Sequence, residues 1–234
     1  MQLIVRNLYE RTADVRWWAT DPSIWQALYD PNPHNLALAT QRLRVIHRYY
    51  TVYSDLVLVD AKGRAVATAN PLYRSAVNSI DYRTADWFRR AVALPSGDQY
   101  VADEVRHSRS QSGRQVLIYA TAVRDQGQTH GTPLGALGVY FDWEVQGTAI
   151  VEDGTALTAG ERTRTELMLI DGKDRVIAGS NRSRLFTQFK VGDPGKRGSY
   201  VDADGHLVAF ARTRGYQEYD GQGWMGVIRQ RLTD

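Results

Sequence analysis

One stretch of the chain occurs twice, and this repeat limits the possible folds more than any other feature. Residues 54–70 and 165–181 align without a gap. Both place an apolar run before a central aspartate, Asp60 or Asp171, and both close on an asparagine. Runs rich in valine and isoleucine that are separated by a Gly or Asp turn are typical of an antiparallel hairpin. The sequence therefore predicts one sheet-forming unit in two copies.

The two copies remain similar beyond the hairpin. Residues 97–101 have a counterpart in residues 198–201, and residues 138–139 have one in residues 226–227. Each copy then reads as strand, turn, strand, connector and three more strands. We therefore expect an antiparallel sheet of about five strands in each of two lobes.

The N-terminal segment reads as helix. Asp21-Pro22 and Asn32-Pro33 each place a capping side chain before a proline at the first helical position, so the helix should restart or kink there. Beyond the second restart, apolar residues recur every three or four positions along a helix that is expected to end near Tyr53. This stripe consists of Leu36, Ala39, Leu43, Ile46, Tyr50 and Tyr53.

The predicted fold class is α+β. Residues 1–53 form a long N-terminal helical segment, residues 54–148 a first lobe and residues 149–234 a second lobe, each lobe having flanking helices. Residues 144–164 return the chain from the first lobe to the second.

A long insert, residues 71–95, separates the paired strands of the first lobe. Within it Thr84 is expected to cap a short helix, Asp86 to favour the positive end of the helix dipole, and Pro95 to stop the helix. Trp87 and Ala91 share one face of this helix with Leu94. Inserts of this length usually carry function.

Composition and motifs exclude several classes of function. Without cysteine there is no disulfide, no thiolate metal site and no cysteine nucleophile. The arginines are scattered rather than gathered into a stripe, which argues against nucleic-acid binding. Residues 200–206 superficially resemble a calcium loop but lack the third oxygen position and the terminal Glu of an EF-hand, so a hairpin turn is expected. No enzymatic motif occurs, and we expect no catalytic residue, metal or cofactor.

No run approaches the roughly 18 to 20 apolar residues that span a bilayer, and residues 1–6 are too short for a signal-peptide core. We expect the sequence to be part of a longer protein whose membrane helices flank it.

The chain has a long N-terminal helix, two lobes that each open with a hairpin carrying a central aspartate, and a Trp-aromatic pair in the first insert. In these features it resembles the double Cache sensor domain, which has PAS-like lobes. The resemblance covers residues 6–231. It rests on the hairpin at 59–64, on Asp86-Trp87-Phe88, on Leu137-Gly138-Val139, and on the closing segment from Gly215-Tyr216 through Gly223-Trp224 to residues 227–230.

The resemblance implies a role. Such domains form the extracytoplasmic part of chemotaxis receptors, sensor histidine kinases and diguanylate cyclases. We therefore expect a non-catalytic, periplasmic sensor domain of an inner-membrane protein, with chemotaxis as the first choice of output, cyclic-di-GMP synthesis as the second and a kinase as the third. A homodimer through the N-terminal helix is also expected. Rival interpretations are an extracytoplasmic protein-interaction module and a cytoplasmic PAS-type domain or enzyme.

The resemblance also places the ligand in the membrane-distal first lobe. In the amino-acid-binding branch, the insert helix reads Arg-x-Trp-Tyr, and an Asp follows the Gly-Val of the last strand. Arg grips the ligand carboxylate and Asp pairs with its ammonium group. Here Ala85 stands in place of that Arg and Tyr140 in place of that Asp, which argues against an α-amino acid, although Arg83 and Asp142 lie near in sequence.

The expected ligand is a small anion or an aromatic metabolite, because Arg side chains supply a charged fork and aromatic rings a stacking face. Counting back along the strand from Thr121 puts His107 and Arg109 near positions that the amino-acid branch fills with Tyr and Asp. The structural alternative is that Trp87 only anchors the insert, that the tyrosines are ordinary strand residues and that the cations are solvated. The expected lining is Tyr82, Arg83, Trp87, His107, Arg109, Tyr119, Tyr140 and Asp142.

Overall fold

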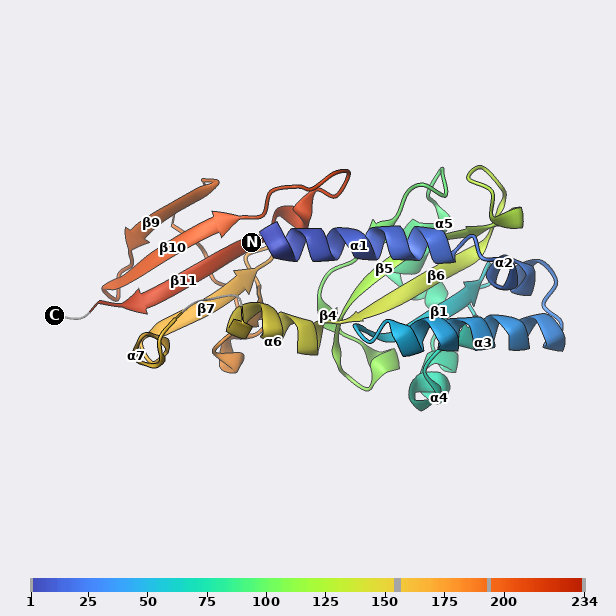
Figure 1. The fold of residues 1–234 in the computed structure, drawn as a ribbon, viewed down its shortest axis with the longest axis horizontal. Helices are drawn as coiled ribbons and strands as arrows, with labels where there is room; N and C mark the ends of the chain where they lie inside the picture. Colours follow the sequence, from blue (N-terminus) through green and yellow to red (C-terminus); the bar gives the residue numbers. More distant parts are fainter. Residues whose placement is uncertain (1, 154–156, 193–194, 233–234) are drawn as a thin grey trace. The chain divides into compact units, whose positions relative to one another are not determined.

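The computed structural model describes residues 2–153, 157–192 and 195–232. The chain divides into two compact units, one of residues 10–144 and one of residues 1–9 and 145–234. Each unit contains one antiparallel sheet (Figure 1). Residues 10–53, which the sequence pattern separates as a helical segment, group with the first unit.

The N-terminal segment forms three helices, α1 (Gln2–Trp18), α2 (Pro22–Tyr29) and α3 (Pro33–Tyr49). Both predicted restarts are confirmed: the Asp21 side chain accepts a hydrogen bond from the Ser23 amide, and the Asn32 side chain accepts one from the Asn35 amide. The last helix ends at Tyr49 rather than near Tyr53, which is the first residue of the first strand. The Tyr53 hydroxyl donates to Asp14 at 2.6 Å, so its ring packs beside α1.

The sheet of the first unit has the strand order β2-β1-β6-β5-β3, with β4 also paired to β5. The sheet of the second unit has the order β8-β7-β11-β10-β9. Corresponding strands of the repeat thus occupy corresponding places, and the predicted duplication is confirmed. The strands of the first unit are β1 (Tyr53–Asp60), β2 (Ala65–Thr68), β3 (Val101–Ala102), β4 (Arg106–His107), β5 (Gln115–Arg124) and β6 (Pro133–Asp142). Those of the second are β7 (Thr165–Ile170), β8 (Val176–Gly179), β9 (Arg197–Val201), β10 (His206–Arg212) and β11 (Met225–Arg231).

The two hairpins agree in detail. The register of β1 and β2 shifts between Leu58 and Val59, and that of β7 and β8 shifts at the equivalent place, between Leu169 and Ile170. In the first turn, Asp60 accepts hydrogen bonds from the backbone and side chain of the arginine four residues later. Asp171 does the same in the second. These contacts explain the shared aspartate as part of the turn.

The two glycines that align in sequence are not equivalent in the sheets. Gly138 lies opposite Val57, whereas Gly226 lies opposite Leu169, which is the repeat equivalent of Leu58. The expected match of residues 138–139 with 226–227 is therefore wrong by one residue. Because side chains alternate along a strand, this offset puts the two glycines on opposite faces of their sheets.

Helices from the insert cover one face of the first sheet. These are α4 (Arg74–Asn78) and α5 (Asp86–Val92), while α2 and α3 pack against the other face (Figure 1). Trp87 and Ala91 are buried in one core, and Leu94, which lies beyond the end of α5, packs against the same core. Thr84 does not cap α5. Ala85 is the N-cap and makes no side-chain capping hydrogen bond. The Thr84 hydroxyl instead donates to the carbonyl of Asp81, which caps the short turn η2 (Tyr82–Thr84).

Two further helices, α6 (Trp143–Asp153) and α7 (Ala159–Arg162), lie in the predicted return segment, of which residues 154–156 are outside the described part. Among the described residues, no helix combines the length and the apolar character needed to cross a membrane.

Candidate functional site

Three of the expected lining residues meet between the first sheet and its insert. Tyr82, Trp87 and Tyr140 are each 1 % exposed, and the Trp87 ring makes edge-to-face contacts with the other two at centroid distances of 5.6 and 6.2 Å. A β-carbon placed on Gly138 would lie 2.7 Å from the indole of Trp87. The indole therefore occupies the space that a side chain at this strand position would fill, and it anchors the insert on the sheet.

A buried carboxylate lies beside these rings. Asp55 is 0 % exposed, and it pairs in register with Tyr140 across β1 and β6. One carboxylate oxygen accepts from the backbone amides of Leu56, Ala69 and Asn70. All these donors are neutral, so the negative charge is held by dipoles rather than by a cation.

The second oxygen of Asp55 faces side chains. It accepts from the Thr68 hydroxyl at 2.6 Å and from Gln111 Nε2 at 3.4 Å. Burial raises the pKa of Asp55 above its usual range, although the hydrogen bonds from Thr68 and Asn70 act in the opposite direction. The site therefore combines a desolvated carboxyl group with polar neighbours.

Two buried polar atoms in this region lack a hydrogen-bond partner. They are Gln111 Oε1 and the Tyr82 hydroxyl, and both are inaccessible to solvent. Burial raises the pKa of Tyr82 to about 12 and holds the pKa of Tyr140 well above its usual range. The Tyr140 and Ser110 hydroxyls influence the Tyr82 pKa and so lie near it, but neither meets it with good hydrogen-bond geometry. Buried polar atoms of this kind usually have partners.

We call this group the polar cluster. Its members are Asp55, Thr68, Tyr82, Ser110, Gln111 and Tyr140. Gln111 and Ser110 belong to the turn η3 (Arg109–Gln111), which faces α4. Chemically, the cluster offers one negative charge, one unsatisfied amide oxygen and aromatic faces, which suits a group with N–H donors.

The three predicted cations lie outside the polar cluster. Arg83 is exposed and pairs with Asp81 at 2.7 Å. His107 is exposed, with Nδ1 2.8 Å from the Gly113 carbonyl oxygen, and Arg109 is exposed on η3. Counting back along one strand from Thr121 does not place His107 and Arg109 correctly, because they belong to β4 and η3 rather than to β5. These three cations therefore add no positive charge to the polar cluster.

Two more expected residues are placed elsewhere. Tyr119 is buried on the other face of the sheet, since its neighbours Ile118 and Ala120 are the ones that pack with Trp87. Asp142 lies on the same side as Tyr140 but makes an ion pair with Arg114 at 2.8 Å. Neither belongs to the polar cluster.

Asp55, Thr68, Ser110 and Gln111 were missed by the sequence analysis. The available signal was the acidic residue at the start of an apolar strand, because a carboxylate in such a run is costly unless it is hydrogen-bonded. The repeat strengthens this signal, since Glu166 occupies the equivalent position of β7. Ser110 and Gln111 carry no comparable signal.

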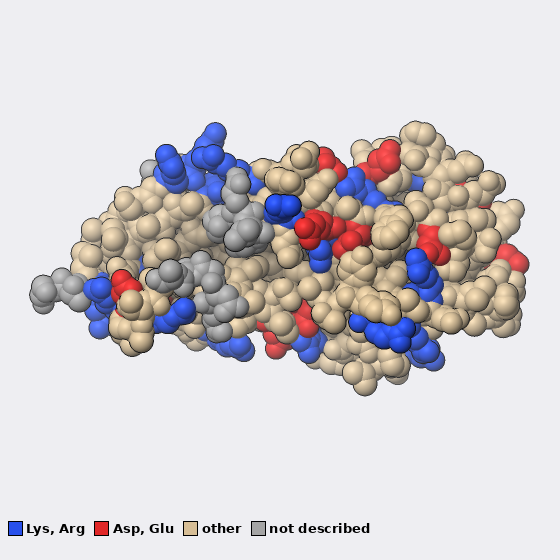
Figure 2. Space-filling view, in the orientation of Figure 1, with Lys and Arg blue, Asp and Glu red and all other residues tan. Residues whose placement is uncertain are grey.

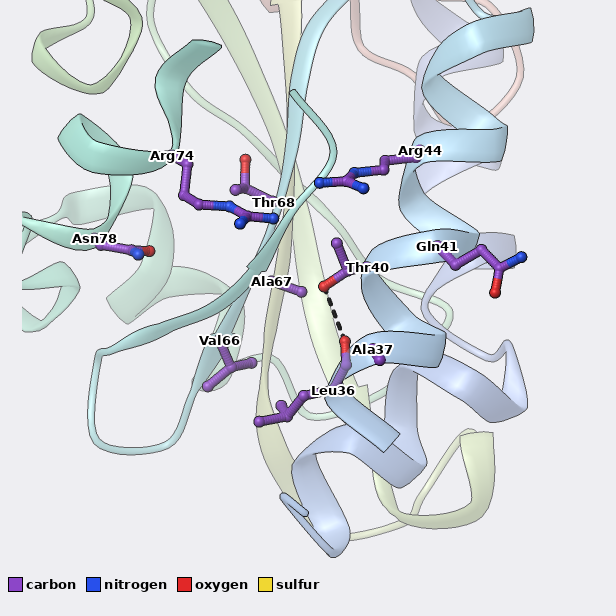
Figure 3. Close-up of a pocket in the computed structure, with 10 residues that line it drawn as sticks. All are labelled: Leu36, Ala37, Thr40, Gln41, Arg44, Val66, Ala67, Thr68, Arg74 and Asn78. Carbon is purple, nitrogen blue, oxygen red and sulfur yellow. Dashed lines mark hydrogen bonds between the residues drawn. The ribbon is translucent and has the colours of Figure 1, made fainter. Parts of the chain in front are cut away.

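A groove lies on the side of the first unit where α3, β2 and α4 meet. Its volume is about 570 Å³ (Figure 3). The lining residues come from these three elements and include two arginines but no acidic residue. None of the residues expected from the sequence to bind a ligand lines this groove.

The turn between β9 and β10 of the second unit carries two aspartates, and an arginine forms hydrogen bonds with both of them. Asp202, Asp204 and His206 bring possible metal ligands within 4.8 Å of one another. Arg229 donates to Asp202 and to Asp204, each at 2.6 Å. The backbone hydrogen bond from His206 lowers the pKa of Asp202 to about 2, together with the side-chain hydrogen bond and the positive charge of Arg229. The predicted hairpin turn is confirmed, and a guanidinium group supplies the positive charge there.

A family model for the Cache domain matches residues 11–233. Among solved structures, the sensor domain of the V. cholerae histidine kinase DctB aligns with a TM-score of 0.72 at 14% identity, covering 99% of this chain and 92% of that one. No curated protein matches the chain.

Two chemoreceptor domains are also similar. The ligand-binding domain of the Pseudomonas aeruginosa PAO1 amino acid chemoreceptor PctC in complex with GABA has a TM-score of 0.67 at 17% identity, over 98% of this chain and 93% of that one. That of the Pseudomonas fluorescens chemoreceptor CtaA in complex with L-serine has a TM-score of 0.62 at 15% identity, over 97% and 90%. At these identities the likeness concerns the fold.

Proposed function

The chain belongs to the Cache domain family, and from this premise we propose that it is the periplasmic ligand-sensing domain of a bacterial inner-membrane receptor. The observation that carries the proposal is the polar cluster beneath the insert, in which Gln111 Oε1 and the Tyr82 hydroxyl are buried without a hydrogen bond of good geometry. A bound ligand would supply the missing partners. The domain needs no catalysis for this role, because sensing requires only different affinities for two conformations.

The proposed ligand is a small molecule that carries an amino group. Gln111 Oε1 can only accept a hydrogen bond, and Asp55 brings a negative charge without a cation among its hydrogen-bond donors. An ammonium group donates hydrogen bonds, is attracted to a carboxylate and can face the ring of Trp87 or Tyr82. This reverses the sign of the ligand charge expected from the sequence, because the arginines that suggested an anion lie outside the cluster.

A carboxylate on the ligand has no evident partner in the cluster. Ala85 stands where the amino-acid-binding branch has its arginine, and Arg83 is engaged by Asp81. We therefore propose an amine rather than an α-amino acid. GABA and L-serine, which occupy the similar PctC and CtaA domains, both carry an amino group.

Titration calorimetry and melting curves test the ligand class. The panel should contain amines, amino acids and carboxylates without an amino group. A ligand that binds only the native state raises the melting temperature with its concentration. We expect amines to bind, and we expect Y82F to weaken the affinity about two- to tenfold, as the loss of one neutral hydrogen bond predicts.

The matched control is Y119F, which removes a tyrosine hydroxyl on the opposite face of the same sheet. It should leave amine affinity unchanged. Binding of carboxylates alone, or an equal loss in Y82F and Y119F, would contradict the proposed ligand class.

Transmission is proposed to be a population shift. Ligand held between the sheet and the insert would favour one arrangement of the first unit, and α1 continues from that unit into the second. We propose a chemotaxis receptor as the first choice of output and a homodimer through the N-terminal helices. The sequence on either side of these residues in the gene tests the output module, and sedimentation of the full-length receptor tests the dimer.

A further inference from the structure

The groove between α3, β2 and α4 has the features of a binding site of its own. It lies at the edge strand of the first sheet and shares only Thr68 with the polar cluster. Its volume of about 570 Å³ falls in the range of small-molecule sites, roughly 300 to 1,000 Å³. The lining residues are Leu36, Ala37, Thr40, Gln41, Arg44, Val66, Ala67, Thr68, Arg74 and Asn78.

Two arginines face each other across this groove. Arg44 extends from α3 and Arg74 from the start of α4, and their guanidinium groups point toward one another (Figure 3). Neither makes a hydrogen bond or an ion pair with another described residue. Arg42, two residues from Arg44, shows the contrast, because it pairs with Asp21 at 2.6 Å.

No acidic side chain lines the groove to neutralise these charges. In the space-filling view, Lys and Arg side chains gather over the C-terminal half of α3 (Figure 2). Two like charges that face each other repel, and an anion between them would convert the repulsion into attraction. A guanidinium group binds carboxylate and phosphate oxygens through two parallel hydrogen bonds.

The rest of the lining limits what kind of anion fits. Leu36, Val66 and Ala67 give an apolar wall, and Asn78 is exposed at the groove. The Thr40 hydroxyl is already used, because it donates to the Leu36 carbonyl at 2.8 Å. An inorganic ion would leave the apolar wall uncovered, whereas an organic oxyanion would cover it.

We propose that this groove binds a small organic oxyanion, a carboxylate or a phosphate ester, held between Arg44 and Arg74. The site meets the polar cluster only at Thr68, and it has the opposite charge preference to the amine site proposed above. The anion bridges α3, which covers one face of the sheet, and α4, which belongs to the insert on the other.

If the polar cluster binds an amine as proposed above, the groove and the cluster are coupled. Arg74 begins the first helix of the insert that covers the polar cluster, and Thr68, which lines the groove, donates its hydroxyl to Asp55. An anion that ties α4 to α3 would hold the insert in place over the cluster. Anion and amine would then alter each other's affinity by the same factor.

The test measures melting temperature against concentration for acetate, succinate, inorganic phosphate and an alkyl phosphate, with chloride at equal ionic strength as the reference. No amine is present, so the result does not depend on the proposed function. We expect a rise specific to the oxyanions, largest for those with an apolar portion. We also expect R44Q/R74Q to weaken their affinity at least tenfold, while the single variants lie between.

The matched control is R48Q/R109Q, which removes two exposed positive charges outside the groove. It should retain the affinity, whereas an equal loss in both double variants would mean general charge attraction and would overturn the site. Without anion, R44Q should melt no lower than the parent chain because the facing charges no longer repel. Absence of any oxyanion-specific rise in the parent chain would also overturn the proposal.

Discussion

Asp55 lies directly opposite Tyr140 across the β1 and β6 pair. Asp55 is the acidic member of the polar cluster, and it lies on the strand next to that of Tyr140. There it is held by backbone amides and by Thr68, so its position is fixed by the hairpin itself.

The first prediction concerns the stability that Asp55 provides. D55N removes a charged acceptor from several buried donors, and we expect a loss of about 2–3 kcal/mol of unfolding free energy. D142N breaks a partly exposed ion pair with Arg114 and should cost under about 1 kcal/mol. Urea unfolding of both variants measures the difference. Equal costs would show that the Asp55 network contributes nothing beyond a surface pair.

The second prediction is the pH dependence of the Asp55 contribution. Burial raises the pKa of this carboxyl above its unfolded value, so between the two pKa values the native state holds a proton that the unfolded state has released. Stability that depends on this proton is present at low pH and is lost as pH rises through the folded pKa. The unfolding free energy of the parent chain relative to D55N should therefore fall as pH increases above about 4, near the ordinary pKa of Asp. A rising difference across that window would mean that the hydrogen bonds outweigh desolvation.

The third prediction tests the close approach of Trp87 to the sheet. G138A would place a methyl group 2.7 Å from the indole, and we expect a cost of about 1–3 kcal/mol from overpacking. G160A is the control, because no atom lies within 4 Å of its added carbon and the residue is helical. It should be neutral or should stabilise by up to about 1 kcal/mol. Restored stability in G138A/W87F would assign the cost to the indole.

The fourth prediction separates backbone strain from contact in the Asp-x-x-Gly turns. Gly63 has φ +75° and Gly205 has φ +76°, so an alanine is strained equally at both positions. The carbon added at Gly63 would lie 2.5 Å from the Arg83 side chain and 2.8 Å from the Arg83 amide, whereas nothing lies within 4 Å at Gly205. We expect G205A to cost about 1 kcal/mol and G63A about 2–3 kcal/mol, since overpacking adds to strain. Thermal unfolding of the two variants gives the comparison, and equal melting temperatures would exclude the contact.

The repeat made the architecture predictable, but not the composition of the site. Asp60 and Asp171 mark turns whose hydrogen bonds are local, so the sequence alone defines them. The positions of His107 and Arg109 depend instead on where β5 loses its partner strand and η3 begins, which is decided by packing against α4. Tyr119 shows the same limit, because a shift of one residue in register reverses the face on which a side chain lies.

The polar cluster was harder still to predict. Its members come from four distant parts of the chain, and Gln111 reaches Asp55 across 56 residues of sequence. Only the acidic residue within an apolar strand pointed to it.

The one-residue offset between Gly138 and Gly226 has a further consequence. In the second unit, the position equivalent to Gly138 is Val227, which packs into the core beside Met168. In the first sheet the space above Gly138 holds the indole of Trp87. In the second sheet the side chain of Val227 fills the equivalent space. The two sheets share the order of their corresponding strands, but only the first leaves room at this position for a tryptophan ring.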